Sequence, residues 1–110
     1  MPNTYKILGQ ARPADTATAT LYTVPAATQA VTSTISVTNV TATPYNVSLY
    51  VVPSGGTASA DNALVYAAEL GANTLQTFTL GLTLGAGDSI AVQSSFASFA
   101  TYQVFGQEIS

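Results

Sequence analysis

The feature of this sequence that most limits its fold is a period of two in hydrophobicity, which recurs in short runs along the chain. In residues 31–38, Val31, Ile35 and Val37 are expected on one face, with Thr and Ser side chains on the other. Successive side chains of a β-strand point to opposite faces, so this alternation is typical of a strand with one buried face. Residues 47–51 repeat the pattern, and there we expect Tyr50 to point outward.

Proline and glycine separate these runs, as at Pro25, Pro44, residues 53–56 and residues 85–88. These residues interrupt strands or supply turn conformations. The predicted strands are 4–9, 19–24, 29–40, 45–52, 62–70, 74–83, 88–94 and 99–107. Eight short strands in 110 residues predict one all-β domain over residues 1–110, an antiparallel β-sandwich. The strand number suits a jelly roll, and periodicity leaves an immunoglobulin-like order open.

Two segments are less regular than the rest. Residues 62–70 contain helix-forming residues at helical spacing, but the neighbouring β-patterns and the short length favour a strand. Residues 1–17 are expected to form an N-terminal strand followed by an arm, because the stretch after Gly9 has no period and little bulk. The predicted core consists of Ile35, Val37, Leu49, Val51, Phe78, Leu80, Ile90 and Val92.

Charged side chains are scarce: only 6% of the residues carry one, and the chain has no His, Cys or Trp. The seven charged residues are Lys6, Arg12, Asp15, Asp61, Glu69, Asp88 and Glu108. The acids lie far apart in sequence, so a catalytic carboxylate pair or a calcium site would need separate loops to converge. We expect turn capping instead, and predict no catalytic residues, no metal and no cofactor. The absence of Cys also excludes a disulfide framework.

The balance of charge argues against two classes of partner. The net charge is −3, and Lys6 and Arg12 are the only cations. Nucleic acids and anionic membranes both need clustered positive charge, so neither is expected to bind. The first residues do not form a signal peptide, and no apolar run is long enough to span a bilayer. We therefore expect synthesis in a cytoplasm without secretion.

A surface built from Thr, Ser, Asn and Gln suits permanent neighbours, because mixed charge is what keeps small domains apart. The sequence therefore favours a structural or assembly protein. Six tyrosines support an interface, since tyrosine is enriched where proteins meet. Ordinary tyrosines at the edge of a core, or tyrosines that stack on sugar rings, remain alternatives.

Four runs of sequence are more specific in their joint order. They are YKILGQ (5–10), ATLYTVPA (19–26), LGLTL (80–84) followed by Asp88, and VFGQEIS (104–110). Together they resemble small virion structural proteins of tailed bacteriophages and cyanophages. The middle of the chain departs from that group, in which a Cys-Asn-Arg and a basic strand are expected where residues 38–40 and 50–53 lie here.

The resemblance implies a non-enzymatic virion protein, assembled in the cytoplasm of a bacterial host. We expect a capsid decoration or cement protein, homotrimeric and bound to the major capsid protein or another virion protein. A tail, neck, baseplate or fibre component is the alternative, and a carbohydrate-binding module for host recognition is the second. The residues expected at the interface are Tyr5, Lys6, Ile7, Leu8, Arg12, Asp15 and Tyr50.

Overall fold

The computed structural model describes residues 3–79, 81–96 and 98–109. These ranges contain no α-helix, and so none that could cross a membrane. They form nine strands and one short 3-10 helix, η1 (Ala60–Asn62). The strands are β1 (Asn3–Ala11), β2 (Ala19–Thr23), β3 (Gln29–Asn39), β4 (Tyr45–Val52), β5 (Ala63–Leu70), β6 (Leu75–Phe78), β7 (Thr83–Leu84), β8 (Ser89–Ser94) and β9 (Ala100–Ile109).

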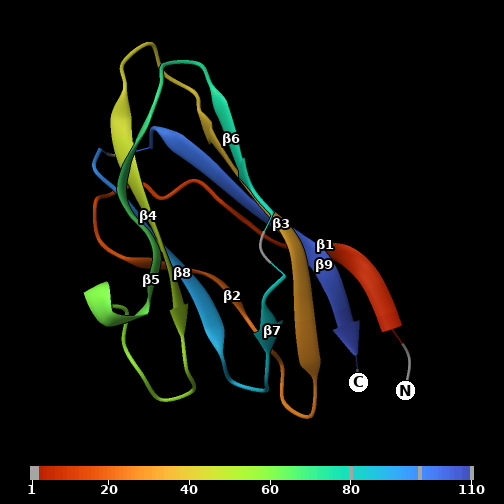
Figure 1. Ribbon diagram of the computed structural model, residues 1–110. Helices are drawn as coiled ribbons and strands as arrows, with labels where there is room; N and C mark the ends of the chain where they lie inside the picture. The colour runs from red at the N-terminus through yellow and green to blue at the C-terminus, as the bar shows by residue number, and fades with distance from the viewer. Residues whose placement is uncertain (1–2, 80, 97, 110) are drawn as a thin grey trace.

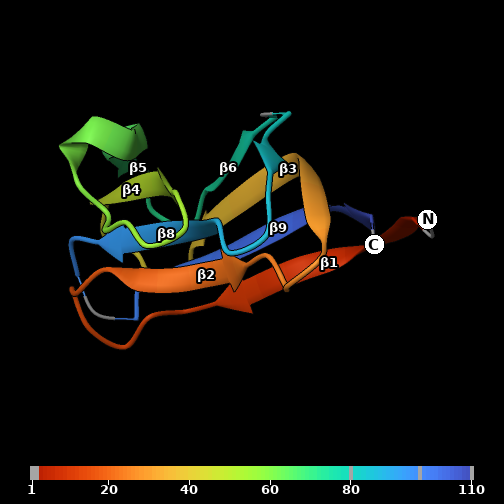
Figure 2. The ribbon, with the colours of Figure 1, turned by 90° about the horizontal axis from the view of Figure 1, so that it is seen from below.

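The strands form two antiparallel sheets that pack as two layers (Figures 1 and 2). Sheet A has the order β1-β9-β3-β6, with β7 also paired to β3, and sheet B has the order β2-β8-β4-β5. The pairing is that of one long hairpin rolled into two layers. Thus β1 pairs with β9, β2 with β8, β3 with β6 and β7, and β4 with β5. This is a jelly roll, which confirms the predicted β-sandwich and decides against an immunoglobulin-like order.

The predicted strand 74–83 is divided into β6 and β7, and the cause lies in its partner. β3 carries a bulge between Thr32 and Thr34, where one extra residue, Ser33, interrupts the register with β9. β6 pairs with β3 after this bulge and β7 pairs with it before the bulge. A bulge bends its strand, so a straight neighbour cannot follow both halves. The described residues therefore form nine strands where eight were expected.

The same bulge corrects the predicted face of Val31. Ala30 and Thr32 are buried before the bulge, and Ile35 and Val37 after it, whereas Val31 is only partly buried. An extra residue shifts the alternation by one position, which moves each following side chain to the other face. A threonine therefore occupies a core position that the sequence pattern gave to a valine.

The main core lies between the sheets and includes most of the predicted residues. Ile35, Val37, Leu49, Ile90 and Val92 are fully buried, which confirms their assignment, whereas Val51 and Phe78 are partly buried against this core. Leu80 lies outside the described residues.

Two aromatic residues that were not predicted to be buried, Phe99 and Tyr102, are the largest of the fully buried side chains. Tyr102 shares a 2.7 Å hydrogen bond with Ser94 Oγ, and burial raises its pKa to about 12.

The outer face of β4 is covered at Tyr50 and Val52, which corrects the expectation for Tyr50. Its side chain points away from the main core, but it is only 3% exposed. Together with Val52 and Ala91 it forms a second apolar cluster, and Ala58 and Ala63 pack against this cluster. The segment that follows β4 thus folds back over the outer face of sheet B. Of the predicted strand 62–70, residues Ala63–Leu70 form β5, whereas Asn62 ends η1.

The predicted N-terminal strand and arm begin as an edge strand of sheet A. β1 pairs with β9 from Asn3↔Ile109 to Ala11↔Tyr102, with a bulge at Leu8. It also lies close against β2, since a Cβ atom added to Gly9 would be 2.3 Å from the carbonyl oxygen of Leu21. Glycine is therefore required at this position for the two sheets to approach at this side.

Candidate interaction surfaces

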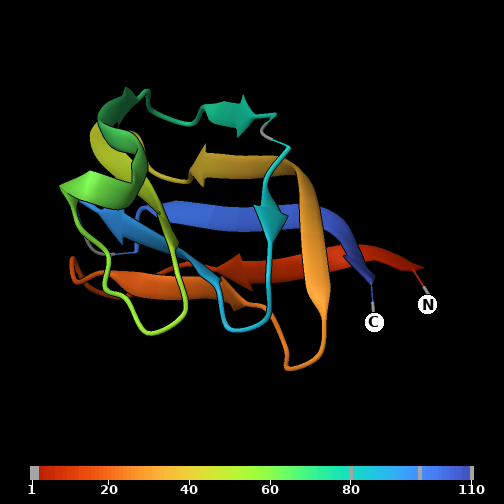
Figure 3. The ribbon, with the colours of Figure 1, turned by 60° about the horizontal axis from the view of Figure 1, so that its bottom comes forward.

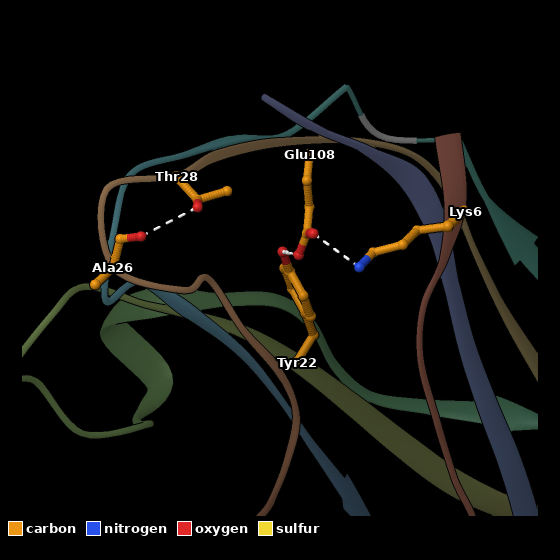
Figure 4. A network of polar contacts seen from close by, with 5 residues as sticks. All are labelled: Lys6, Tyr22, Ala26, Thr28 and Glu108. Carbon is orange, nitrogen blue, oxygen red and sulfur yellow. Dashed lines mark hydrogen bonds and ion pairs between the residues drawn. The ribbon is translucent and has the colours of Figure 1, made fainter. Parts of the chain in front are cut away.

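Lys6, one of the predicted interface residues, is engaged within its own chain. Its Nζ lies 2.8 Å from Glu108 Oε1, and the Tyr22 hydroxyl donates a 2.5 Å hydrogen bond to Glu108 Oε2 (Figure 4). This trio links β1, β9 and β2. The hydrogen bond from Lys6, with that from Tyr22, lowers the pKa of Glu108 below its ordinary value. Burial, reinforced by the contact with Glu108, raises the pKa of Tyr22.

The other predicted interface residues are not gathered into one surface. Ile7 is 51% exposed on β1, whereas Leu8 is partly buried and packs against the core. Arg12 and Asp15 are exposed in the loop after β1, where Asp15 Oδ1 accepts a hydrogen bond from the Ala17 amide. The side chain of Tyr5 lies outside the described residues.

Among the remaining acids, Asp88 caps turns as expected. Its two carboxylate oxygens accept hydrogen bonds from the Ser54 and Gly85 amides, each at 2.9 Å, and so join two loops at one end of the sandwich. Asp61 and Glu69 are exposed. Within the described residues, no group of three or more acids lies together in a way that could hold a metal ion.

Exposed apolar residues on neighbouring segments at the opposite end of the sandwich were not predicted. We call Val40, Tyr45, Leu75 and Phe96 the aromatic end. Phe96 is 50% exposed and stacks on Tyr45, with ring centroids 4.6 Å apart and an interplanar angle of 2°. Tyr45 in turn meets buried Phe99 edge-on at 5.0 Å, which fixes it to the core.

Backbone hydrogen bonds bring the segments of the aromatic end together. The Asn39 amide donates to the Thr74 carbonyl, and the Val40 amide donates to the Phe99 carbonyl. Val40 and Leu75 are 44% and 57% exposed. One sequence signal could have found this surface: residues 95–99 place two phenylalanines in a run without period-two alternation. The meeting of the loops depends on topology and has no local signal.

The outer face of sheet B is hollowed beside the second apolar cluster. We call this hollow, of about 300 Å³, the outer-face pocket. It lies over β4, β5 and β8, and all of its lining residues are uncharged. They are Thr16, Asn46, Ser48, Tyr66, Ala67, Gln93, Ser94 and Ser95.

No protein-family model matches the chain, and no curated protein matches it significantly. The fold is similar to a chain in the solved structure of the Gx strain of infectious bursal disease virus. The TM-score is 0.53 and the sequence identity 12%, and the match covers 97% of this chain and 31% of that chain. A chain in the structure of the Gt strain of that virus matches with TM-score 0.48, 12% identity, and coverage of 96% and 31%.

This chain therefore spans about a third of the length of the virus chains that it matches. At 12% identity the likeness to the Gx-strain chain concerns the fold alone, because one fold serves many unrelated functions.

Proposed function

We propose that this chain is a non-enzymatic structural protein of a virus particle, and that it acts as a decoration or cement subunit on the capsid of a tailed phage. The observation that carries the proposal is the aromatic end. It offers exposed, well-supported aromatic and aliphatic side chains on a surface that has few charges. Aromatic residues of this kind are the usual anchors of protein interfaces.

The jelly roll gives further support, since this fold is common in viral capsid domains. The few charged groups do not oppose docking, because Lys6 and Glu108 neutralise each other and Asp88 is held by two amides. In a virus particle, adjacent subunits would cover this charge-poor surface, which would otherwise favour association with other molecules.

Stabilisation of the shell follows from buried area. Each copy that bridges adjacent capsid subunits adds contacts that must break before the shell opens. Apolar burial contributes about 25 cal/mol per Å² before the costs of association are subtracted. A homotrimer repeats the same modest contact three times around one axis, which fits the local symmetry of a capsid lattice.

Reconstitution tests this proposal. Purified protein is added to particles that lack it, with heads and tails separated, and binding is measured by co-sedimentation. We expect binding to heads and a rise in the temperature at which they release DNA. Phe96→Ser should abolish both effects. Ile7→Ser, which changes an equally exposed apolar residue on β1, is the matched control and should leave them unchanged.

Other results of the co-sedimentation experiment would support a different role or a different docking surface. Binding to tails alone would replace decoration by a tail, neck, baseplate or fibre role. Loss of binding with Ile7→Ser but not with Phe96→Ser would move the docking surface to β1. Absence of binding to either part of the particle would contradict the proposal.

A further inference from the structure

We infer that the outer-face pocket binds a neutral pyranose sugar, with Tyr66 as the platform on which the ring stacks. This activity goes beyond the proposed structural role and does not depend on it. The ring of Tyr66 borders the pocket and is 64% exposed, the highest exposure among the large apolar side chains of the described residues.

An irregularity in the β4–β5 pairing directs the side chain of Tyr66 outward. In the β4–β5 pairing, Val47 faces Ala68 and Leu49 faces Val65, so Tyr66 and Ala67 together oppose the single residue Ser48. This is a bulge, a device that redirects side chains and is frequent beside functional sites. Both Tyr66 and Ala67 consequently face outward and line the pocket.

The bulge has an energetic cost. Ala67 has a φ of +51°, a conformation that costs a non-glycine residue roughly 1–2 kcal/mol. Its amide is satisfied by a 2.8 Å hydrogen bond to Ser48 Oγ, another lining residue. Ser48 thus holds Ala67 in a strained conformation, and strain of this kind is often found at functional sites.

Tyr66 is buttressed from below. Tyr50 meets it edge-on, with ring centroids 6.5 Å apart and an interplanar angle of 79°. The Tyr50 hydroxyl donates to Gln93 Oε1 at 3.0 Å, and Gln93 Nε2 donates to the Thr16 carbonyl at 3.3 Å. This chain of contacts fixes both the aromatic platform and an amide at the pocket wall. Preorganised groups of this kind reduce the entropy cost of binding.

The lining offers the polar groups that a sugar requires. Side-chain amides and hydroxyls donate and accept hydrogen bonds, as sugar hydroxyls do. The side-chain amide of Asn46 has no hydrogen-bond partner among the described residues, so its donors and acceptor are available. The apolar C–H face of a pyranose ring matches the face of Tyr66, while its hydroxyls reach the amides.

Charge and size narrow the ligand further. The register pairs Asn46 with Glu69, which places an exposed carboxylate on the same face beside the pocket. This carboxylate disfavours phosphates, nucleotides and acidic sugars, for which the lining supplies no cation. A volume of about 300 Å³ is at the lower end of ligand pockets and suits one ring at the end of a glycan.

Ligand-observed NMR by saturation transfer, with the full chain, tests this inference. The probes are glucose, galactose, mannose and N-acetylglucosamine, with N-acetylneuraminic acid as the acidic control. We expect saturable binding of at least one neutral sugar and a weaker signal from the acidic one. Titration calorimetry with the best probe then gives its affinity.

Three variants assign the binding to the pocket. Tyr66→Ala should weaken the affinity by about tenfold or more, because it removes the stacking surface. Tyr66→Phe keeps the ring and should stay within about threefold of the unmodified protein. Phe96→Ala removes an exposed aromatic residue that does not line the pocket, and it should leave the affinity within about threefold. Circular dichroism checks that each variant is folded.

The inference is overturned if no neutral sugar binds, or if the acidic sugar binds best. It is also overturned if Tyr66→Ala and Phe96→Ala weaken binding equally, because the contact is then unspecific. None of these outcomes bears on capsid docking, which is measured separately with particles.

Discussion

The two sides of the sandwich differ in whether their side chains contact the rest of the chain or remain exposed. At the side where β1 lies beside β2, the sheets are tied together (Figures 2 and 3). The Gly9 backbone touches that of Leu21, and the trio of Lys6, Glu108 and Tyr22 links three strands. At the opposite side, β5 and β6 end the two sheets. There Tyr66 and Leu75, two of the most exposed large apolar residues, lie on these edge strands.

The difference shows that the few charged residues, which stand out in the sequence, need not be the ones that are free to contact a partner. The only described ion pair, that of Lys6 with Glu108, stabilises the fold within this chain. Most of the exposed large apolar side chains of the described residues lie on the β5–β6 side and at the adjoining loops, whereas Ile7 is the exposed one on β1. We therefore expect substitutions on the β1–β2 side to reduce stability, and substitutions on the β5–β6 side to reduce binding.

The largest effect is expected from Gly9→Ala. The added Cβ would meet a backbone carbonyl oxygen at 2.3 Å, so the two strands must move apart. We expect a loss of about 1–3 kcal/mol in the free energy of unfolding, measured by chemical denaturation. Gly81→Ala is the control, because a Cβ there meets nothing within 4 Å, and it should stay within about 0.5 kcal/mol. Equal losses in the two variants would remove the distinction between the sides.

A smaller loss is expected from Glu108→Gln. This change removes the charge that pairs with Lys6 and weakens the bond accepted from Tyr22. Because Lys6 is 45% exposed and solvent screens the pair, the expected loss at pH 7 is about 1 kcal/mol. Glu69→Gln, on exposed β5, should leave thermal stability unchanged. A Glu108→Gln variant as stable as the unmodified protein would show that the trio does not hold the sheets together.

Lowering the pH should weaken the contribution of Glu108 and its two partners to stability. The pKa of Glu108 is lower in the folded than in the unfolded chain, so its contribution is complete above the unfolded value, near 4.5. It is lost as the pH falls from there through the folded pKa, because the carboxylate must take up a proton. Melting temperatures should therefore fall less between pH 6 and pH 3 in Glu108→Gln than in the unmodified protein. Parallel curves for the two proteins would contradict this assignment.

The smallest effect on stability is expected from Leu75→Ser at the β5–β6 side. Leu75 is 57% exposed, so unfolding should change by less than about 0.5 kcal/mol. Binding to capsids should nevertheless weaken, since Leu75 belongs to the aromatic end. A co-sedimentation titration with the unmodified protein as reference measures this. Unchanged binding would limit the docking surface to the residues around Phe96.

Much of the fold follows from local sequence, because strands with one buried face show their alternation directly. Ile90 and Val92 on β8 are buried as predicted. Val31 was assigned to the wrong face, since the bulge at Ser33 depends on pairing with β9, about 70 residues away. Tyr50 points outward as predicted, yet it is covered by a segment whose path has no period.

The candidate surfaces were harder to predict for the same reason. Phe96 and Leu75 come from loops and an edge strand that meet only when the hairpin is rolled. The bulge that presents Tyr66 is likewise set by its register with β4. Sequence composition shows that the surface is poor in charge, but the location of the exposed apolar residues depends on contacts between distant segments.

A density map of the virus particle tests the central claim most directly. The account predicts this jelly roll on the outside of the capsid, in groups of three, with Phe96 and the rest of the aromatic end facing the shell and β1 turned away from it. Density for the chain in the tail or neck, or contact with the shell through β1, would contradict it.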